Sequence, residues 1–300
     1  MKEDAYRFGR HEHLVGVVTR PASASAEAPA VIIVNAGFVH HVGPFQLHVQ
    51  LAREIAKLGL SSLRFDLSGI GDSGLPPVRQ PVSERKLADI GDAIAFMDSQ
   101  FGIEDIVMLG LCSGAVDSLN AASRFDSVRA VVMLDPPAYP DTLSRLIGYL
   151  ERIASPKRLL RYVRRKTGEL VSGDSGKKEP APLIHKPMPV EQFAQRIEAT
   201  TRRGVSYMVA YTRNEDYKHK NQLYSVLTDA TPRAQITVCR FPKFDHTQIL
   251  RADRLVVIET VCSWLNEGSE WKKKRSEKTS SGLLNSTNGF PRERSAIDPN

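Results

Sequence analysis

The segment GLCSG at positions 110–114 has the clearest potential for chemistry in the sequence. It follows an apolar run and precedes a stretch of small residues. That order is typical of a sharp strand-to-helix turn, which raises the middle side chain above a sheet. The middle residue is Cys112, and a helix start lowers the pKa of a thiol placed there, which favours a nucleophile. The alternative is that Cys112 is only a small buried apolar side chain.

A base and an acid for such a nucleophile are expected after later strands of the same sheet. His246 follows the apolar run 235–241, and we predict that it is the base. Asp216 follows the run 205–211, and we predict that it is the acid that orients the imidazole. Glu215, its neighbour, and Asp135, which ends another apolar run, are the alternative acids.

Two backbone N–H groups should stabilise the negative charge that develops when a thiolate attacks a carbonyl. The residue after the nucleophile, Ser113, is expected to supply one of them. The loop after the run 31–35 should supply the other, and we predict Phe38, because Gly37 before it permits an unusual turn.

His40 and His41 lie just beyond this loop and could line a pocket or contact a substrate. Ordinary polar loop positions are the equal alternative. A metal bound by this pair would need a third ligand, which the sequence does not identify. We therefore assign neither a metal nor another cofactor.

Apolar runs and amphipathic stretches alternate along most of the chain, which indicates an α/β fold with a parallel sheet and crossover helices. The expected strands are 13–19, 31–35, 61–66, 105–110, 129–134, 205–211 and 235–241. The expected helices are 45–59, 86–99, 113–124, 217–228 and 249–265.

The alternation stops between the expected strands 129–134 and 205–211. Residues 140–201 contain helical stretches at 141–153, 156–166 and 190–201 and a polar loop at 171–182, so we predict a helical cap or lid inserted into the core. The core then comprises 1–139 and 202–267. The polar, non-periodic residues 268–300 predict a disordered tail.

Composition limits the class of protein. Three cysteines without a CxxC pair argue against a disulfide framework and favour a reducing, cytoplasmic location. No apolar run approaches the length of a membrane span, and the N-terminal residues lack the apolar core of a secretory signal. The net charge is +7, but no nucleic-acid-binding motif accompanies the basic clusters, which we interpret as solvated surface. These clusters are Lys157–Arg165, Lys177–Lys178 and Lys272–Arg275.

Residues 10–266 resemble the α/β-hydrolase superfamily. The matching motifs are NAGF at 35–38, RFDLSGIGDSG at 64–74, GLCSG at the turn, the acidic loop 214–216 and DHT at 245–247. The motif at 64–74 is similar to that of the serine aminopeptidase-like and exosortase-associated hydrolases. The resemblance implies an eight-stranded, mostly parallel sheet flanked by helices. Two departures are Ala36-Gly37 in place of His-Gly and Cys112 in place of serine.

Three functions are compatible with these residues. The first is hydrolysis of an ester or thioester through a Cys-His-Asp triad and an acyl-enzyme, with a small or carrier-linked acyl substrate. The second is acyl transfer on the same triad to an acceptor other than water. The third is a non-catalytic binding protein on the same fold. The sequence gives no indication of the acyl group, the acceptor or the oligomeric state.

Overall fold

The computed structural model describes residues 1–23, 28–153, 188–213, 216–228 and 230–267. Several predicted features lie outside the described residues. These are the helix 156–166, the loop 171–182, the tail 268–300, Glu215 and the three basic clusters.

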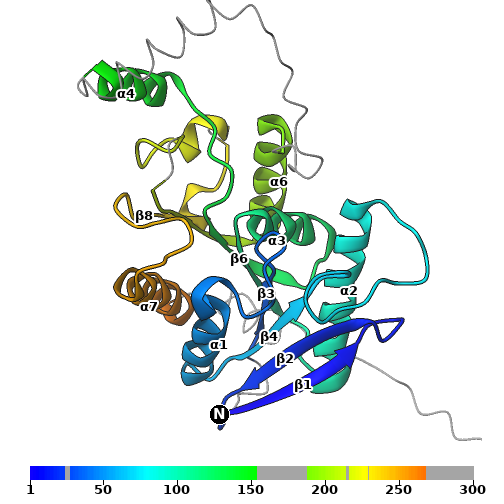
Figure 1. The fold of residues 1–300 in the computed structure, drawn as a ribbon. Coiled ribbons are helices and arrows are strands. Elements are labelled where there is room, and N and C mark those ends of the chain that lie inside the picture. Colours follow the sequence, from blue (N-terminus) through cyan, green and yellow to red (C-terminus); the bar gives the residue numbers. More distant parts are fainter. Residues whose placement is uncertain (24–27, 154–187, 214–215, 229, 268–300) are drawn as a thin grey trace, which may run out of the picture.

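An eight-stranded sheet in the order β1-β2-β4-β3-β5-β6-β7-β8 forms the centre of the molecule (Figure 1). Its first two neighbouring pairs, β1 with β2 and β2 with β4, are antiparallel, and the other five are parallel. The predicted eight-stranded, mostly parallel sheet is therefore confirmed. Its strands are β1 (Lys2–Phe8), β2 (Leu14–Arg20), β3 (Ala30–Val34), β4 (Ser61–Asp66), β5 (Ile106–Leu111), β6 (Val128–Leu134), β7 (Ser206–Tyr211) and β8 (Ile236–Arg240).

Helices cover both faces of this sheet. The helices α1 (Leu47–Lys57) and α7 (Arg251–Glu267) pack on one face and share a buried apolar cluster with the strands. On the other face lie α2 (Val82–Phe101), α3 (Ser113–Arg124) and α6 (Val190–Arg202), with a second cluster (Figure 1). The two clusters explain why β3 and β5 are apolar along their whole length, since both of their faces are buried.

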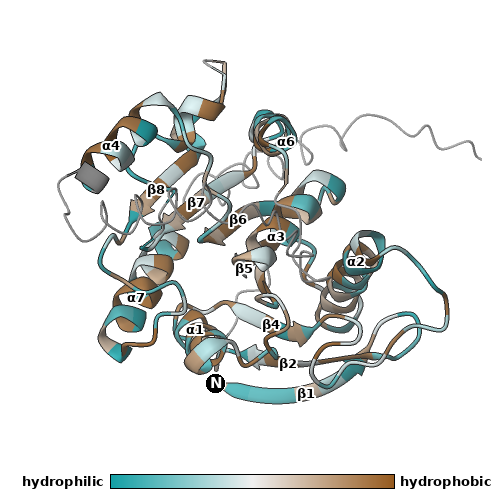
Figure 2. Ribbon diagram, turned by 45° about the horizontal axis from the view of Figure 1, so that its top comes forward, coloured by the Kyte–Doolittle hydropathy of each residue, from teal (hydrophilic) through white to brown (hydrophobic). Residues whose placement is uncertain are grey.

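The edge strand β1 is absent from the sequence prediction, and its pattern explains why. Its residues are exposed or partly buried except for Phe8, and the strand is hydrophilic in Figure 2. A polar edge strand lacks the apolar run by which the inner strands are recognised. It forms because β2 offers a free edge, on which β1 closes the hairpin.

The predicted helix 217–228 is wrong. The structure has only a short 3-10 turn there, η2 (Leu223–Val226). The side chain of Gln222, which is buried, accepts a hydrogen bond from the backbone N–H of Lys218 at 2.7 Å and donates to the carbonyl of Tyr139 at 3.0 Å. An amide side chain that bonds nearby backbone groups in this way competes with helix formation.

The segment between β6 and β7 contains α4 (Thr142–Ile153) and α6. The two helices differ in burial. Phe193 and Ile197 of α6 are fully buried and belong to the core cluster beside α3. Four large apolar side chains of α4 are exposed, namely Leu143, Leu146, Tyr149 and Leu150. The division of this segment into a cap distinct from the core stays a prediction. Within the described residues, none of the helices has the length and apolar character needed to span a membrane.

Gly114 is a packing constraint at the start of α3. A Cβ atom at this position would lie 2.5 Å from the carbonyl oxygen of Asn35, which belongs to the backbone of the loop after β3. We expect Gly114→Ala to lower the free energy of unfolding by about 2 kcal/mol, because overpacking against backbone outweighs the gain in helix propensity. Urea unfolding measures this change.

Gly148 in α4 is the matched control. The nearest atom to its added Cβ is the Lys218 Cε at 4.0 Å. Gly148→Ala should leave the free energy of unfolding unchanged or raise it by up to about 1 kcal/mol. Equal effects of the two substitutions would contradict the packing argument.

Candidate active site

Cys112 occupies a strained turn where β5 ends and α3 begins. Its backbone has φ 58° and ψ −116°, a conformation that is uncommon for a residue with a side chain. Its N–H donates to the carbonyl of Leu134 on the neighbouring strand at 2.8 Å, and its carbonyl accepts from Ala115 at 3.1 Å. The turn is therefore held from both the sheet and the helix, and the Cys112 side chain is exposed.

The glycines that flank the turn are there for steric reasons. A Cβ at Gly110 would lie 2.1 Å from the carbonyl carbon and oxygen of Gly114. No side chain fits between the end of β5 and the first turn of α3. The glycine spacing that identified the turn in the sequence is thus a requirement of this close packing.

A line of hydrogen bonds runs from Cys112 through His246 to Asp135. The Cys112 thiol is hydrogen-bonded to the imidazole of His246, which lies on the loop after β8. His246 Nδ1 lies 2.9 Å from Asp135 Oδ2. Asp135 is buried at the end of β6 and also accepts hydrogen bonds from the backbone N–H of Thr212, at 2.6 Å, and from its hydroxyl. The Asp135 carboxylate is thus hydrogen-bonded to three groups, the N–H and hydroxyl of Thr212 and the imidazole of His246.

The prediction that Asp216 orients the imidazole needs correction. In the structure the carboxylate that contacts His246 Nδ1 is that of Asp135. β6 lies directly beside β5 in the sheet, so an acid that immediately follows β6 is adjacent to the nucleophile turn. Asp216 lies beyond the end of β7 and its side chain is exposed. The signal for Asp135 was present in the sequence, because this residue directly follows an apolar run.

The electrostatics of this line favour a thiolate–imidazolium pair. Hydrogen bonds to Asp135 and then to Cys112 raise the pKa of His246 from its ordinary value of 6.5 to about 10, against the opposing effect of burial. The hydrogen bond with His246 lowers the pKa of the Cys112 thiol, with a smaller contribution from the backbone N–H of Ser113. Both shifts favour an imidazolium over a neutral imidazole and a thiolate over a thiol.

The loop after β3 is fastened to the nucleophile turn. The backbone N–H of Gly37 donates to Ser113 Oγ at 2.8 Å, and Gly37 adopts φ 60° in a turn closed by Val39 N–H and the Ala36 carbonyl. Phe38 lies in this turn with a 68% exposed side chain. The backbone N–H of Ser113 helps to lower the pKa of the Cys112 thiol, so this predicted donor lies near the sulfur.

Arg254 in α7 supports the loop that carries His246, a role that no sequence pattern indicated. Its Nη1 donates to the carbonyls of Gln248 and Ile249 at 2.7 Å each. The guanidinium also lies over the ring of Phe45, 5.7 Å from its centroid. Arg254 is buried, which is rare for an arginine, and its burial is visible only in the structure.

His40 and His41 face two carboxylates that extend from the end of β4. His41 Nδ1 lies 2.7 Å from Asp66 Oδ2, and His40 Nε2 lies 2.9 Å from Asp72 Oδ2. Burial raises the pKa of Asp66, but hydrogen bonds from His41 and Asn35 outweigh it, and the pKa is lowered overall. Contact of either histidine with a substrate stays a prediction.

Another Ser, His and Asp set lies on the opposite side of β4. Ser68 Oγ donates to Asp89 Oδ1 at 2.6 Å, and His13 Nε2 lies 2.9 Å from Ser68 Oγ. All three side chains are buried. The Asp89 carboxylate lies 3.4 Å from His13 Nε2, the same ring nitrogen that meets the serine, so it does not orient the histidine through Nδ1 as in a catalytic triad. It joins the start of β2 to α2.

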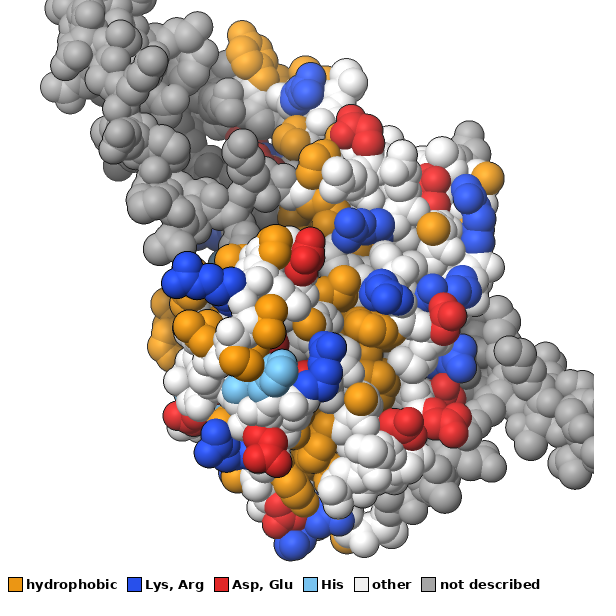
Figure 3. Space-filling model, turned by 90° about the vertical axis from the view of Figure 1, so that its right-hand side faces the viewer, with side chains coloured by type: hydrophobic (Ala, Val, Ile, Leu, Met, Phe, Trp, Pro, Cys, Tyr) orange, Lys and Arg blue, Asp and Glu red, His pale blue; other side chains and the backbone are white. Residues whose placement is uncertain are grey.

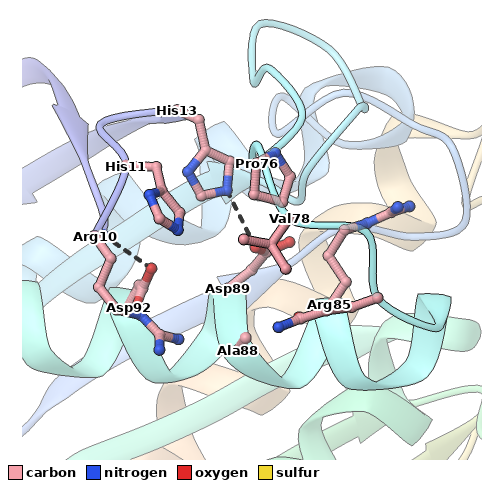
Figure 4. A pocket seen from close by; sticks show the side chains of 10 residues that line it. Arg10, His11, His13, Pro76, Val78, Arg85, Ala88, Asp89 and Asp92 are labelled. Atoms are coloured by element: carbon pink, nitrogen blue, oxygen red, sulfur yellow. Dashed lines mark hydrogen bonds and ion pairs between the residues drawn. The ribbon is translucent and has the colours of Figure 1, made fainter.

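A pocket of about 280 Å³ lies next to this set, between the β1–β2 turn and α2 (Figure 4). Asp92 in it accepts hydrogen bonds from the backbone and side chain of Arg10, at 3.0 and 2.8 Å. On the side of the molecule that bears α2, basic and acidic side chains are interspersed with apolar ones and histidine (Figure 3). None of the residues of the Cys112 line belongs to the lining. The lining residues are Arg10, His11, His13, Pro76, Val78, Gln80, Arg85, Ala88, Asp89 and Asp92.

Comparisons with known proteins agree with the fold. A family model described as alpha/beta hydrolase fold matches residues 29–183. An esterase of Pyrococcus furiosus is 15% identical, with 89% of this chain and 91% of that chain covered and a TM-score of 0.57. A proline iminopeptidase of Mycobacterium smegmatis is 16% identical, with 89% and 100% covered and a TM-score of 0.57.

A Xanthomonas campestris protein described as an a/b serine hydrolase without lid is 14% identical, with 89% and 94% covered and a TM-score of 0.51. No match was found among curated proteins. At these identities the solved structures support the fold alone.

The three cysteines should differ sharply in reactivity. Burial raises the pKa of Cys239, and that of Cys262 to about 11, whereas the pKa of Cys112 is lowered by His246. We expect iodoacetamide at pH 7 to alkylate Cys112 first, because only the thiolate reacts. Peptide mass mapping identifies the labelled residue.

The pH dependence of this alkylation gives a second readout. The midpoint for Cys112 should lie below the ordinary thiol value of 9.0 and should move upward in His246→Ala. Labelling of Cys239 or Cys262 at the same rate, or a midpoint that His246→Ala leaves unchanged, would argue against the ion pair.

Proposed function

Since the chain belongs to the α/β-hydrolase-fold family, we propose that it is an acyl hydrolase that cleaves esters or thioesters through an acyl-enzyme on Cys112. The observation that carries this proposal is the line of hydrogen bonds from Cys112 through His246 to Asp135. It supplies a nucleophile, a proton carrier and an orienting acid in the order that acyl transfer requires.

In the first step the Cys112 thiolate attacks the carbonyl carbon of the substrate. The C–S bond forms, and the carbonyl oxygen takes the electron pair. We assign the backbone N–H of Ser113 as the first donor to that oxygen, and its effect on the pKa of the neighbouring Cys112 thiol supports this assignment. We assign the second donor to Phe38, because the loop that contains it is fastened to the turn through Gly37 and Ser113.

His246 then acts as an acid. The imidazolium gives its proton to the leaving alcohol or thiol as the tetrahedral intermediate collapses to the thioester on Cys112. Acylation removes the thiolate that helped to raise the pKa of His246, so the imidazole becomes a better base for the second step. It takes a proton from water, which attacks the thioester and releases the acid.

A thiolate favours thioesters, activated esters and lactones over peptides, because a thiolate is a better leaving group than the amide nitrogen. The exposure of Cys112 supports hydrolysis over transfer to another acceptor, since water reaches the thiol. The likeness to an esterase structure is consistent with ester substrates. A free thiol as nucleophile also requires a reducing compartment, so we infer a cytoplasmic location.

A panel of aryl esters and acyl-thioesters tests the activity. We expect wild-type protein to release the aryl alcohol or thiol, Cys112→Ala to lose nearly all turnover, and Cys112→Ser to retain a small part, because an alcohol at this position is far less ionised. Product analysis with added alcohols and amines separates hydrolysis from acyl transfer. Equal turnover in wild-type protein and Cys112→Ala would end the proposal.

The identity of the acid is tested by paired amide substitutions. Asp135→Asn removes the charge that holds His246 as an imidazolium, and we expect a decrease in kcat of roughly 10²- to 10⁴-fold. Asp216→Asn, which changes an exposed acid, should have a much smaller effect. A larger loss in Asp216→Asn than in Asp135→Asn would show that Asp216, and not Asp135, is the orienting acid.

The pH profile of kcat/KM follows from the same pair. As pH falls through the lowered pKa of Cys112 the thiolate is protonated, and as pH rises through about 10 His246 loses the proton that the leaving group needs. We expect a bell whose alkaline limb lies near pH 10, measured with a substrate whose leaving group must be protonated. An alkaline limb near the ordinary histidine value of 6.5 would contradict this assignment.

A further inference from the structure

Four side chains from two loops converge beside the loop that carries Phe38. His40 and His41 follow β3, Asp66 ends β4, and Asp72 lies in the turn after it. One oxygen or nitrogen from each lies within 4.8 Å of those from the other three. β3 and β4 are parallel neighbours, so the loops at their carboxyl ends meet at one edge of the sheet.

The chemistry of this set is that of a cation site. Two imidazoles and two carboxylates form a mixed nitrogen and oxygen donor set, which suits zinc better than calcium or magnesium. His40 Nε2 lies 2.9 Å from Asp72 Oδ2 and 3.5 Å from Asp66 Oδ2, so two carboxylates converge on one imidazole. The negative charges of the Asp66 and Asp72 carboxylates would balance the positive charge of one divalent ion.

We propose that His40, His41, Asp66 and Asp72 bind one zinc ion.

The separations are close to those of a tetrahedral site. Zinc–nitrogen and zinc–oxygen bonds of about 2.0–2.2 Å place neighbouring ligands about 3.3–3.6 Å apart. Three of the four separations between a histidine and a carboxylate are 2.7, 2.9 and 3.5 Å, and the fourth is within 4.8 Å. Ligand shifts of less than about 1 Å therefore open the centre. The two outer side chains have room for this, because His40 is 38% exposed and Asp72 is 62% exposed.

The buried ligand of the site, Asp66, is held in place by hydrogen bonds. The Asp66 side chain is fully buried, and its Oδ1 accepts from Asn35 Nδ2 at 2.9 Å and from the His41 N–H at 2.6 Å. Oδ2 faces the two histidines and also accepts from the backbone N–H of Asp72 at 3.1 Å. Such second contacts orient a ligand before the metal arrives.

Gly71 is needed for this convergence. A Cβ there would lie 2.3 Å from Asp66 Oδ2 and 2.6 Å from His40 Cδ2. The missing side chain is what allows the carboxylate and the imidazole to approach each other.

Zinc binding to the purified full chain tests the site, with a chromophoric chelator as competitor. We expect one ion per chain, and a loss of affinity of about 100-fold or more in both His40→Ala and Asp72→Asn. Both side chains are partly or largely exposed, so neither substitution should prevent folding. His11→Ala, which removes an exposed histidine elsewhere, is the matched control and should bind as wild type.

Zinc could instead bind to Cys112 and His246. A second experiment therefore measures zinc binding in Cys112→Ser. We expect it to retain the zinc site, and cobalt in wild-type protein to give ligand-field bands without a thiolate-to-metal charge-transfer band. Loss of binding in Cys112→Ser would place the ion on the thiol and overturn the proposal. Absence of stoichiometric binding, or binding that His40→Ala and Asp72→Asn leave unchanged, would overturn it as well.

Discussion

The hydrogen bond between His246 Nδ1 and Asp135 Oδ2 is the interaction on which the chemistry of Cys112 depends. The buried carboxylate stabilises a charged imidazole, and the charged imidazole in turn stabilises the thiolate. The bond also fixes the orientation of a side chain that comes from a loop. Without it the sulfur would be an ordinary exposed thiol at the start of a helix, with a weak dipole as its main source of activation.

The parallel sheet makes this interaction geometrically available. Cys112 follows β5, and Asp135 follows its neighbour β6, so strand pairing sets their separation before any side chain is placed. His246 comes from a longer loop and needs support of its own. Arg254 supplies it by bonding two carbonyls of that loop, so the histidine is positioned by α7 as well as by Asp135.

The same edge of the sheet brings together the four side chains of the proposed zinc site. The loop after β3 lies between the two groups, bonded to Ser113 through Gly37 and to Asp66 through Asn35 and His41. An ion bound there would order the loop that carries Phe38. The two sites thus share a structural element, although each has its own set of chemical groups.

Local sequence determined the turn and the helices and strands around it, because both depend on short-range properties. Gly110 and Gly114 are required by contacts within the turn itself, and inner strands such as β5 are recognisable because both of their faces are buried. His246 was identified because it follows a strand. The tertiary structure alone decided which acid meets it, since Asp135 and Asp216 both follow strands and only strand order distinguishes them.

Long-range contacts also explain what the sequence left out or predicted wrongly. The carboxylates that face His40 and His41 come from another loop, so no local pattern could pair them. β1 forms because it pairs with the edge of β2. The predicted helix 217–228 does not form, because the Gln222 side chain bonds backbone groups of Lys218 and Tyr139. Local patterns specify backbone conformation, whereas strand order and the paths of loops specify which side chains meet.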